Sequence, residues 1–158
     1  MSQIKTILMV CTGNSCRSVM AGGLLEQMLK GKDGFKVITA GVSASTGMKS
    51  TQETIQVMSE EGIDVSAHRS QPISGELVAE ADLILVMESR HKEIIIAQSP
   101  QARDKVYLLR EFGRVKPANE FFLPDISDPI GKSLEFYRKV GVIIKENLAR
   151  VVKELEKQ

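Results

Sequence analysis

The stretch "ILMVCTGNSCRSVMAGGLLEQML", residues 7–29, decides both the fold and the candidate chemistry of this chain. Its first residues belong to a short, largely branched apolar run at 4–10, which is typical of a buried strand. Residues 11–18 follow and are mostly small or polar. A helical pattern then runs from about 17 to 30, with apolar residues at Leu24, Leu25, Met28 and Leu29. The stretch therefore predicts a strand, a loop and a helix in direct succession.

Strand and helix continue to alternate along the rest of the chain. Further strand patterns lie at 35–41, 81–87 and 105–109, and further helical patterns lie at about 50–63, 89–99 and 131–156. Such alternation requires crossover connections, which produce a parallel sheet covered on both faces, with ligand sites at the carboxyl ends of its strands. We therefore predict an α/β fold: a single three-layer domain, residues 1–158, with a four-stranded parallel sheet and helices on both faces.

Smaller signals refine this prediction. Ser50 and Glu53 have the spacing of a capping box at the start of the second helix, which should stop at Gly62. Residues 110–130 contain Gly113 and three prolines without a sustained period, so we expect the longest irregular stretch, and a functional loop, there. The last helix places on one face Leu134, Tyr137, Gly141, Ile144, Leu148, Val151 and Leu155.

Composition argues against several classes of protein. Hydrophobic residues make up 42% of the 158 residues, and 21 Lys and Arg balance 20 Asp and Glu, so neither disorder nor a basic surface for nucleic acid is indicated. No apolar run is long enough for a signal sequence or for the roughly 18 residues that span a bilayer. We expect a soluble, cytoplasmic protein that binds neither nucleic acid nor membrane. The only cysteines, Cys11 and Cys16, lie in one short loop, where a catalytic or redox role fits better than a structural disulfide.

The loop at 11–18 has the residue types that bind an anion. Five residues separate Cys11 from Arg17, between a strand and a helix N-terminus. Amides in such a loop can curl round a tetrahedral oxyanion, and the helix dipole adds to the attraction. Gly13 and Asn14 allow backbone conformations that other residues rarely adopt. Arg17 can grip two oxygens with its planar guanidinium, while the same positive field favours the thiolate of Cys11. We expect phosphate or another oxyanion to be bound by Thr12, Gly13, Asn14, Ser15, Cys16, Arg17 and Ser18.

Two motifs carry a resemblance to a known family. "VCTGNSCRS" at 10–18 is similar to the signature of the low-molecular-weight protein phosphatases. "SDPIG" at 127–131 resembles the Asp-Pro motif that those enzymes carry shortly before their last helix. The resemblance covers nearly the whole chain in length and element order. It implies a four-stranded parallel sheet flanked by helices, a phosphorylated protein as substrate, and a two-step phosphate transfer that needs no metal or other cofactor.

The resemblance also implies catalytic roles. Cys11 would attack the phosphorus and hold it as a cysteinyl phosphate, while Arg17 and the loop amides stabilise the oxygens. Asp128 would protonate the leaving group and then activate water, and Asp125 is its rival for this role. Ser18 would hydrogen-bond the sulfur.

Supporting roles follow from the same resemblance. Asn14 would brace the loop through polar partners, for which His68 and Ser43 are the matching positions. Cys16 could trap an oxidised Cys11 as a reversible disulfide.

His91 opens a charged helix, and we expect it to be solvated.

The substrate is less clear from the sequence, because the motifs depart from the tyrosine phosphatases of this family. Those enzymes have two tyrosines after the Asp-Pro and a bulky aliphatic residue in the cysteine loop, where this chain has Ile130, Gly131 and Ser15. Phe121 and Phe122 could supply an aromatic wall instead. The protein-arginine phosphatase branch carries a threonine at the Ser15 position and a non-tyrosine and a glycine after its Asp-Pro. We therefore expect phosphotyrosine or phosphoarginine as substrate, with a preference for phosphoarginine.

Two other functions remain open at this point. "CTGNSCRS" is also the wording of thioredoxin-coupled arsenate reductases of the same fold, but residues 81–99 lack the further cysteines of their disulfide relay. An arsenate reductase would therefore need an external thiol. The second alternative is a module that binds an oxyanion without catalysis, although binding alone needs neither Cys11 nor Asp128.

Overall fold

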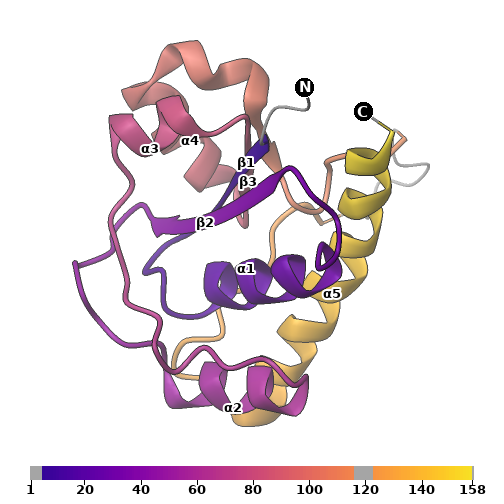
Figure 1. Cartoon of the computed structure of the whole chain (residues 1–158). Coiled ribbons are helices and arrows are strands. Elements are labelled where there is room, and N and C mark those ends of the chain that lie inside the picture. The colour runs from indigo at the N-terminus through magenta and orange to yellow at the C-terminus, as the bar shows by residue number, and fades with distance from the viewer. Residues whose placement is uncertain (1–4, 116–122, 158) are drawn as a thin grey trace.

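The computed structural model describes residues 5–115 and 123–157, and it contains a central parallel sheet (Figure 1). The strands are β1 (Lys5–Cys11), β2 (Phe35–Gly41), β3 (Leu83–Val86) and β4 (Val106–Leu108). They lie in the order β2-β1-β3-β4, and every neighbouring pair is parallel. The predicted four-stranded parallel sheet is therefore confirmed, and β1, which leads into the cysteine loop, lies in its interior.

Helices cover both faces of this sheet. One layer contains α1 (Arg17–Met28), α2 (Gln52–Glu60) and α5 (Leu134–Glu156), and the other contains α3 (Gly75–Glu80), α4 (Ser89–Gln98) and a 3₁₀ helix, η1 (Pro100–Lys105). Alternation along β1 explains the two layers, because successive side chains of a strand point to opposite faces. Ile7, Met9 and Cys11 join the core under α1 and α5, whereas Leu8 and Val10 join the core under α3 and α4.

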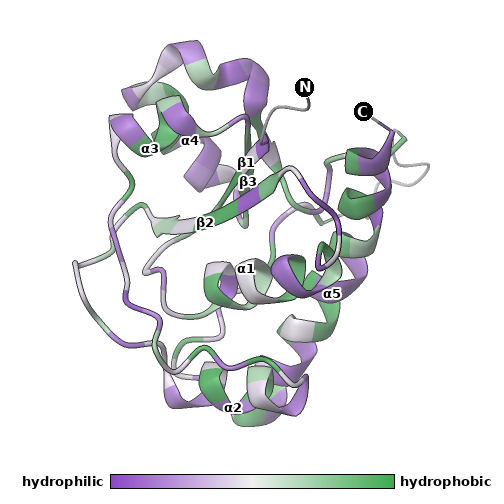
Figure 2. Cartoon of the chain, in the orientation of Figure 1, coloured by the Kyte–Doolittle hydropathy of each residue, from purple (hydrophilic) through white to green (hydrophobic). Residues whose placement is uncertain are grey.

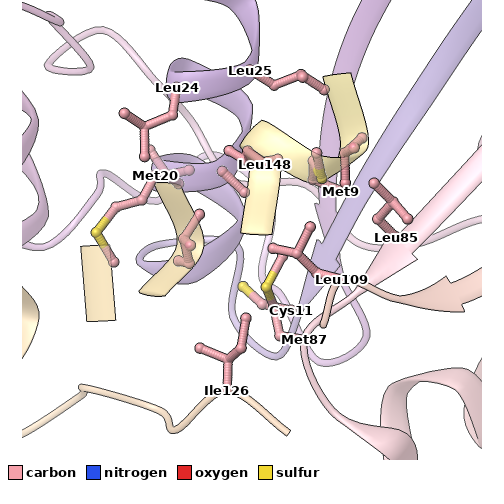
Figure 3. Packing of buried hydrophobic residues seen from close by; sticks show 14 of the residues in the cluster. Met9, Cys11, Met20, Leu24, Leu25, Leu85, Met87, Leu109, Ile126 and Leu148 are labelled. Atoms are coloured by element: carbon pink, nitrogen blue, oxygen red, sulfur yellow. The ribbon is translucent and has the colours of Figure 1, made fainter. Parts of the chain in front are cut away.

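The larger core extends to the candidate site. Figure 3 shows Cys11 close to Met87, Leu109 and Ile126, at one end of a cluster that continues through Met20 and the leucines of α1. Burying each such large apolar side chain contributes about 1.5–3 kcal/mol relative to leaving it in water. The cysteine at the end of β1 therefore packs against the larger of the two hydrophobic cores.

The long helix α5 is amphipathic, as predicted. Hydrophilic and hydrophobic residues alternate along it in Figure 2, and all but one of the predicted face residues are buried. The exception is Leu134, in the first turn, which is only half-buried. Two residues of the buried face, Val140 and Asn147, were not predicted.

Helix ends differ from the prediction where a local hydrogen bond decides them. Helix α2 begins after Thr51, whose side chain accepts a hydrogen bond from the Thr54 amide. The predicted capping box from Ser50 to Glu53 is therefore wrong, and Ser50 is buried with no hydrogen-bond partner for its hydroxyl among the described residues. Helix α5 begins three residues later than predicted, because Ser133 caps it.

Two short elements were missed altogether. The six-residue helices α3 and η1 are too short to show a clear apolar period. Within 110–130, the described residues form no helix or strand, as predicted, while Phe121 and Phe122 lie outside them. In the described part of the chain, no helix is long and apolar enough to cross a membrane.

Candidate active site

The phosphate loop, residues 11–18, lies between the carboxyl end of β1 and the first turn of α1. Asn14 has a φ of 54°, the left-handed conformation that was predicted for it. Gly13 is not among the residues with positive φ. Cys16 is the N-cap of α1 and makes no side-chain capping bond. The first amides of α1 therefore have no side-chain cap, which suits a helix N-terminus that binds an anion.

Cys11 contacts a hydroxyl whose orientation is determined by a neighbour. Its sulfur is 3.0 Å from the Ser18 Oγ, and that oxygen accepts a hydrogen bond of 2.8 Å from the Asn14 Nδ2. Because the asparagine donates to Ser18, the serine proton remains available for the sulfur. The Cys11 side chain is only 2% exposed, so this contact is shielded from water.

Asn14 is braced by a second loop, 65–74. Its Oδ1 accepts from the backbone amide of Gln71 at 3.0 Å, and its backbone carbonyl oxygen accepts from the His68 Nε2 at 3.0 Å. The predicted contact with His68 is thus present, but Ser43 does not contact the asparagine: its amide donates to the Thr12 carbonyl at 2.9 Å. Gln71 was not predicted, because a glutamine in a loop carries no pattern.

A glycine of β2 makes room for the loop. Gly41 pairs with Cys11 across the parallel strands, and the Cβ of any larger residue there would lie 2.5 Å from the Thr12 carbonyl oxygen and 2.8 Å from the Asn14 nitrogen. Real Cβ atoms do not approach backbone so closely, so only glycine lets the loop pack on this strand. Sequence reasoning missed this role, although a glycine that ends a strand is a signal of close backbone approach.

Arg17 is buried and its guanidinium is oriented by a glutamate. The side chain is 1% exposed, and its Nη1 donates to the Glu88 Oε2 at 2.6 Å and to the Ile126 carbonyl at 2.6 Å. Its Nη2 lies 3.2 Å from the Thr12 Oγ1 and 3.6 Å from the Asp128 Oδ2. A buried cation needs such a counter-ion. Glu88, the residue that supplies it, was not predicted.

The charge of Glu88 is maintained by Arg17. Burial alone raises the pKa of this carboxyl, but the hydrogen bond and charge of Arg17 outweigh that effect and lower it overall. Glu88 therefore stays ionised beside the arginine at neutral pH.

His91 starts α4 together with Glu88 and reaches the phosphate loop. The expectation that it is solvated is wrong, because it is 0% exposed. Its Nδ1 accepts from the Glu88 amide at 3.1 Å, which completes a capping box. The proton therefore lies on Nε2, which donates to the Thr12 Oγ1 at 2.9 Å. Burial, followed by the nearby Arg17 charge, lowers the pKa of His91 to about 4, so the ring is neutral at physiological pH.

The two candidate acids have different surroundings. Asp125 Oδ1 accepts from the Ser89 amide at 2.8 Å and from its hydroxyl at 3.0 Å, so this carboxylate is engaged at the start of α4. Asp128 is 40% exposed and is the acid that lies beside Arg17, while its Oδ1 accepts from the Ile130 amide at 3.0 Å. Of the two, Asp128 is the one that lies beside the buried arginine of the loop.

Cys16 lies away from water among hydroxyl groups. Its sulfur is 3.6 Å from the Tyr137 hydroxyl and 3.7 Å from both the Ser15 Oγ and the Thr51 Oγ1. Burial is the main reason that the pKa of Tyr137 is raised. Both cysteines are buried free thiols, and a disulfide between them stays a prediction. No cluster of three or more His, Cys, Asp or Glu among the described residues could hold a metal ion.

The carboxyl end of β1 thus brings together a buried cysteine, a buried arginine and an aspartate that lies 3.6 Å from that arginine. The family model "Low molecular weight phosphotyrosine protein phosphatase" matches residues 6–158, and the chain belongs to this family. It is a cysteine-dependent protein phosphatase of the low-molecular-weight type.

Relatives of two kinds are similar to this chain. A "Probable low molecular weight protein-tyrosine-phosphatase EpsP" from Ralstonia solanacearum is 40% identical over 148 residues, which are 94% of this chain and 89% of the relative. A "Protein-arginine-phosphatase" from Bacillus subtilis is 36% identical over 153 residues, 96% of this chain and 97% of the relative. In the solved structures, a mutant of YwlE arginine phosphatase "with phosphorylated active site serine" has a TM-score of 0.88 and 34% identity, over 97% of each chain.

Proposed function

We propose that this phosphatase acts on phosphorylated proteins with Cys11 as its nucleophile. The thiolate attacks phosphorus in line with the leaving group, forming the S–P bond while the bond from phosphorus to the leaving group breaks. The loop amides and Arg17 stabilise the oxygens of the transferred group. Asp128 gives its proton to the leaving atom. The product of this step is a cysteinyl phosphate and a free side chain on the substrate protein.

In the second step, the Asp128 carboxylate takes a proton from water as the water oxygen attacks phosphorus. The S–P bond breaks and phosphate is released. Ser18 assists by donating a hydrogen bond, while keeping its proton, to the departing sulfur as that sulfur becomes a thiolate again. Each step balances without metal or redox chemistry, so we propose that no cofactor takes part.

The observation that carries this proposal is the relay from Asn14 through Ser18 to the Cys11 sulfur, because a cysteine that only packed in the core would need no oriented donor. The relatives named above are phosphatases, which favours hydrolysis over arsenate reduction by an external thiol and over binding alone. The proposed reaction needs a reduced thiol, which is consistent with the proposed location in the cytoplasm.

Replacing the nucleophile tests the proposal. We expect Cys11→Ser to abolish hydrolysis of p-nitrophenyl phosphate while vanadate binding is retained, because the amides and Arg17 remain. The matched control is Cys16→Ser, which removes the other buried thiol and should keep turnover. Near-normal turnover by the Cys11 variant would exclude that residue as the nucleophile.

For the substrate side chain, we propose a preference for phosphoarginine over phosphotyrosine. Ser15 is small and half-buried, and within the described ranges its hydroxyl makes only a long contact with the Cys16 sulfur, so it can hydrogen-bond a guanidinium. Ser15→Ile should shift the ratio of kcat/KM toward phosphotyrosine by about 1–3 kcal/mol. An unchanged ratio would show that Ser15 does not discriminate between the two substrates.

A further inference from the structure

A short two-stranded ribbon lies next to the phosphate loop, on the side of Ser15. Residues 47–50 and 68–71 lie side by side in Figure 1, and Lys49 and Arg69 form an antiparallel bridge. The ribbon is held by backbone hydrogen bonds of 2.8 Å from the Gly47 amide to the Ser70 carbonyl and from the Ser70 amide to the Met48 carbonyl. This part of the chain is therefore a defined surface, which we call the cationic ribbon.

The cationic ribbon is connected directly to the phosphate loop. His68, next to Arg69, donates to the Asn14 carbonyl at 3.0 Å. Thr51, two residues after Lys49, donates its amide to the Ser15 carbonyl at 3.3 Å. A protein whose phosphorylated residue enters the loop would therefore bring its flanking residues over this ribbon.

Lys49 and Arg69 are two like charges on opposite residues of the bridge, and the Arg69 Nη1 donates to the His68 carbonyl at 2.9 Å. Residues directly opposite in an antiparallel pair have Cβ atoms only about 4.5–5.5 Å apart, and like charges there are destabilising. Both side chains are exposed, and neither forms an ion pair within the described ranges 5–115 and 123–157. Neither 41–52 nor 65–74 contains an Asp or Glu. Among the residues that the structure describes, no carboxylate therefore pairs with either cation of the ribbon.

We infer that the cationic ribbon recognises acidic residues that flank the phosphorylated residue of a substrate protein. Two adjacent cations match two carboxylates of an extended peptide. Between them in sequence, Met48 is 59% exposed and offers an apolar contact. This inference rests on the proposed function, since it names the class of protein that the same site accepts.

The test compares two synthetic phosphopeptides with the same phosphoresidue, one flanked by Asp and Glu and the other by Asn and Gln. Wild type should have the higher kcat/KM on the acidic peptide, by about two- to fivefold for each cation, and added salt should reduce the difference. Lys49→Gln with Arg69→Gln should remove the preference, and Lys49→Glu with Arg69→Glu should reverse it toward a Lys-flanked peptide. Lys153→Gln, an exposed lysine on α5, is the matched control.

Turnover of p-nitrophenyl phosphate measures the phosphatase activity separately from the recognition of acidic flanks, because this substrate has no flanking residues. It should be unchanged in the ribbon variants. Equal kcat/KM for the two peptides in wild type, or a preference that persists in the double variant, would overturn the inference while leaving the phosphatase activity intact. If wild type hydrolyses neither substrate, the proposed function fails, and the affinities of the Cys11→Ser variant for the two peptides still decide whether the ribbon selects acidic flanks.

Discussion

The phosphate loop and the segment that carries Asp128 differ in how firmly the rest of the protein holds them. Asn14 and Ser18 are 0% exposed and Arg17 is 1% exposed, and their polar atoms bond to residues from several elements. Asp128 is 40% exposed, and its described polar neighbours are Arg17 and the nearby Ile130 amide. The loop that we propose binds phosphate is thus integral to the core, whereas the segment that we propose handles the leaving group lies at the surface.

The largest expected effect is on the rate of hydrolysis, and it comes from the exposed segment that carries Asp128. Asp128→Ala should slow hydrolysis of substrates with poor leaving groups by about 10²–10⁴-fold, because these need a proton in the transition state. Phosphate binding and the urea midpoint should hardly change. If Asp125→Ala shows this kinetic pattern and Asp128→Ala does not, the acid is Asp125.

At the buried phosphate loop, removal of Glu88, the counter-ion of Arg17, should lower both stability and activity. We expect Glu88→Ala to lower the free energy of unfolding by about 3 kcal/mol, because an uncompensated buried charge is left behind. The control is Glu60→Ala, which removes an exposed pair with Arg138 and should cost about 1 kcal/mol or less. Similar urea curves for the two variants would show that the Arg17 charge is satisfied in another way.

Gly41 tests how tightly the loop packs on β2. Gly41→Ala should weaken vanadate binding and cost about 2 kcal/mol of stability, since the added methyl group meets loop backbone and not a flexible side chain. Gly75→Ala is the control, because a Cβ there meets nothing within 4 Å. A stable Gly41 variant with unchanged vanadate affinity would mean that the loop can shift without loss.

The smallest effect concerns pH. His91 has a pKa lowered from 6.5 to about 4 in the folded state, so between these values the unfolded chain binds a proton that the folded protein does not. Stability should therefore fall as the pH drops from 6.5 toward 4, by an amount on the order of 1 kcal/mol at pH 5. The pKa of Glu88 is lowered from 4.5, so the stability that its charge contributes is lost mainly below about pH 4.5, in the acidic part of this range. Urea unfolding at pH 7 and pH 5 should show a weaker pH dependence in His91→Gln, and an equal dependence would exclude His91 as the cause.

The same contrast explains what the sequence could predict. The strand, the phosphate loop and the spacing from Cys11 to Arg17 are continuous in the chain, so local pattern and local chemistry sufficed. Glu88 and Gly41 join the site only through the order of strands in the sheet, because each follows or ends a strand beside β1. His91 was assigned to the surface because its neighbours are charged, whereas the capping box with Glu88 turns it inward.

The pairing of Cys11 with Gly41 at the last position of β1 has a consequence for how this enzyme loses its activity. A strand with neighbours on both sides and a core on both faces belongs to the part of a domain that opens only when the whole cooperative unit unfolds. Partial unfolding at the periphery will therefore leave the sulfur where it is. The position of Cys11 and the native fold are therefore lost together. Activity should decline in step with the fraction of native protein as the protein unfolds.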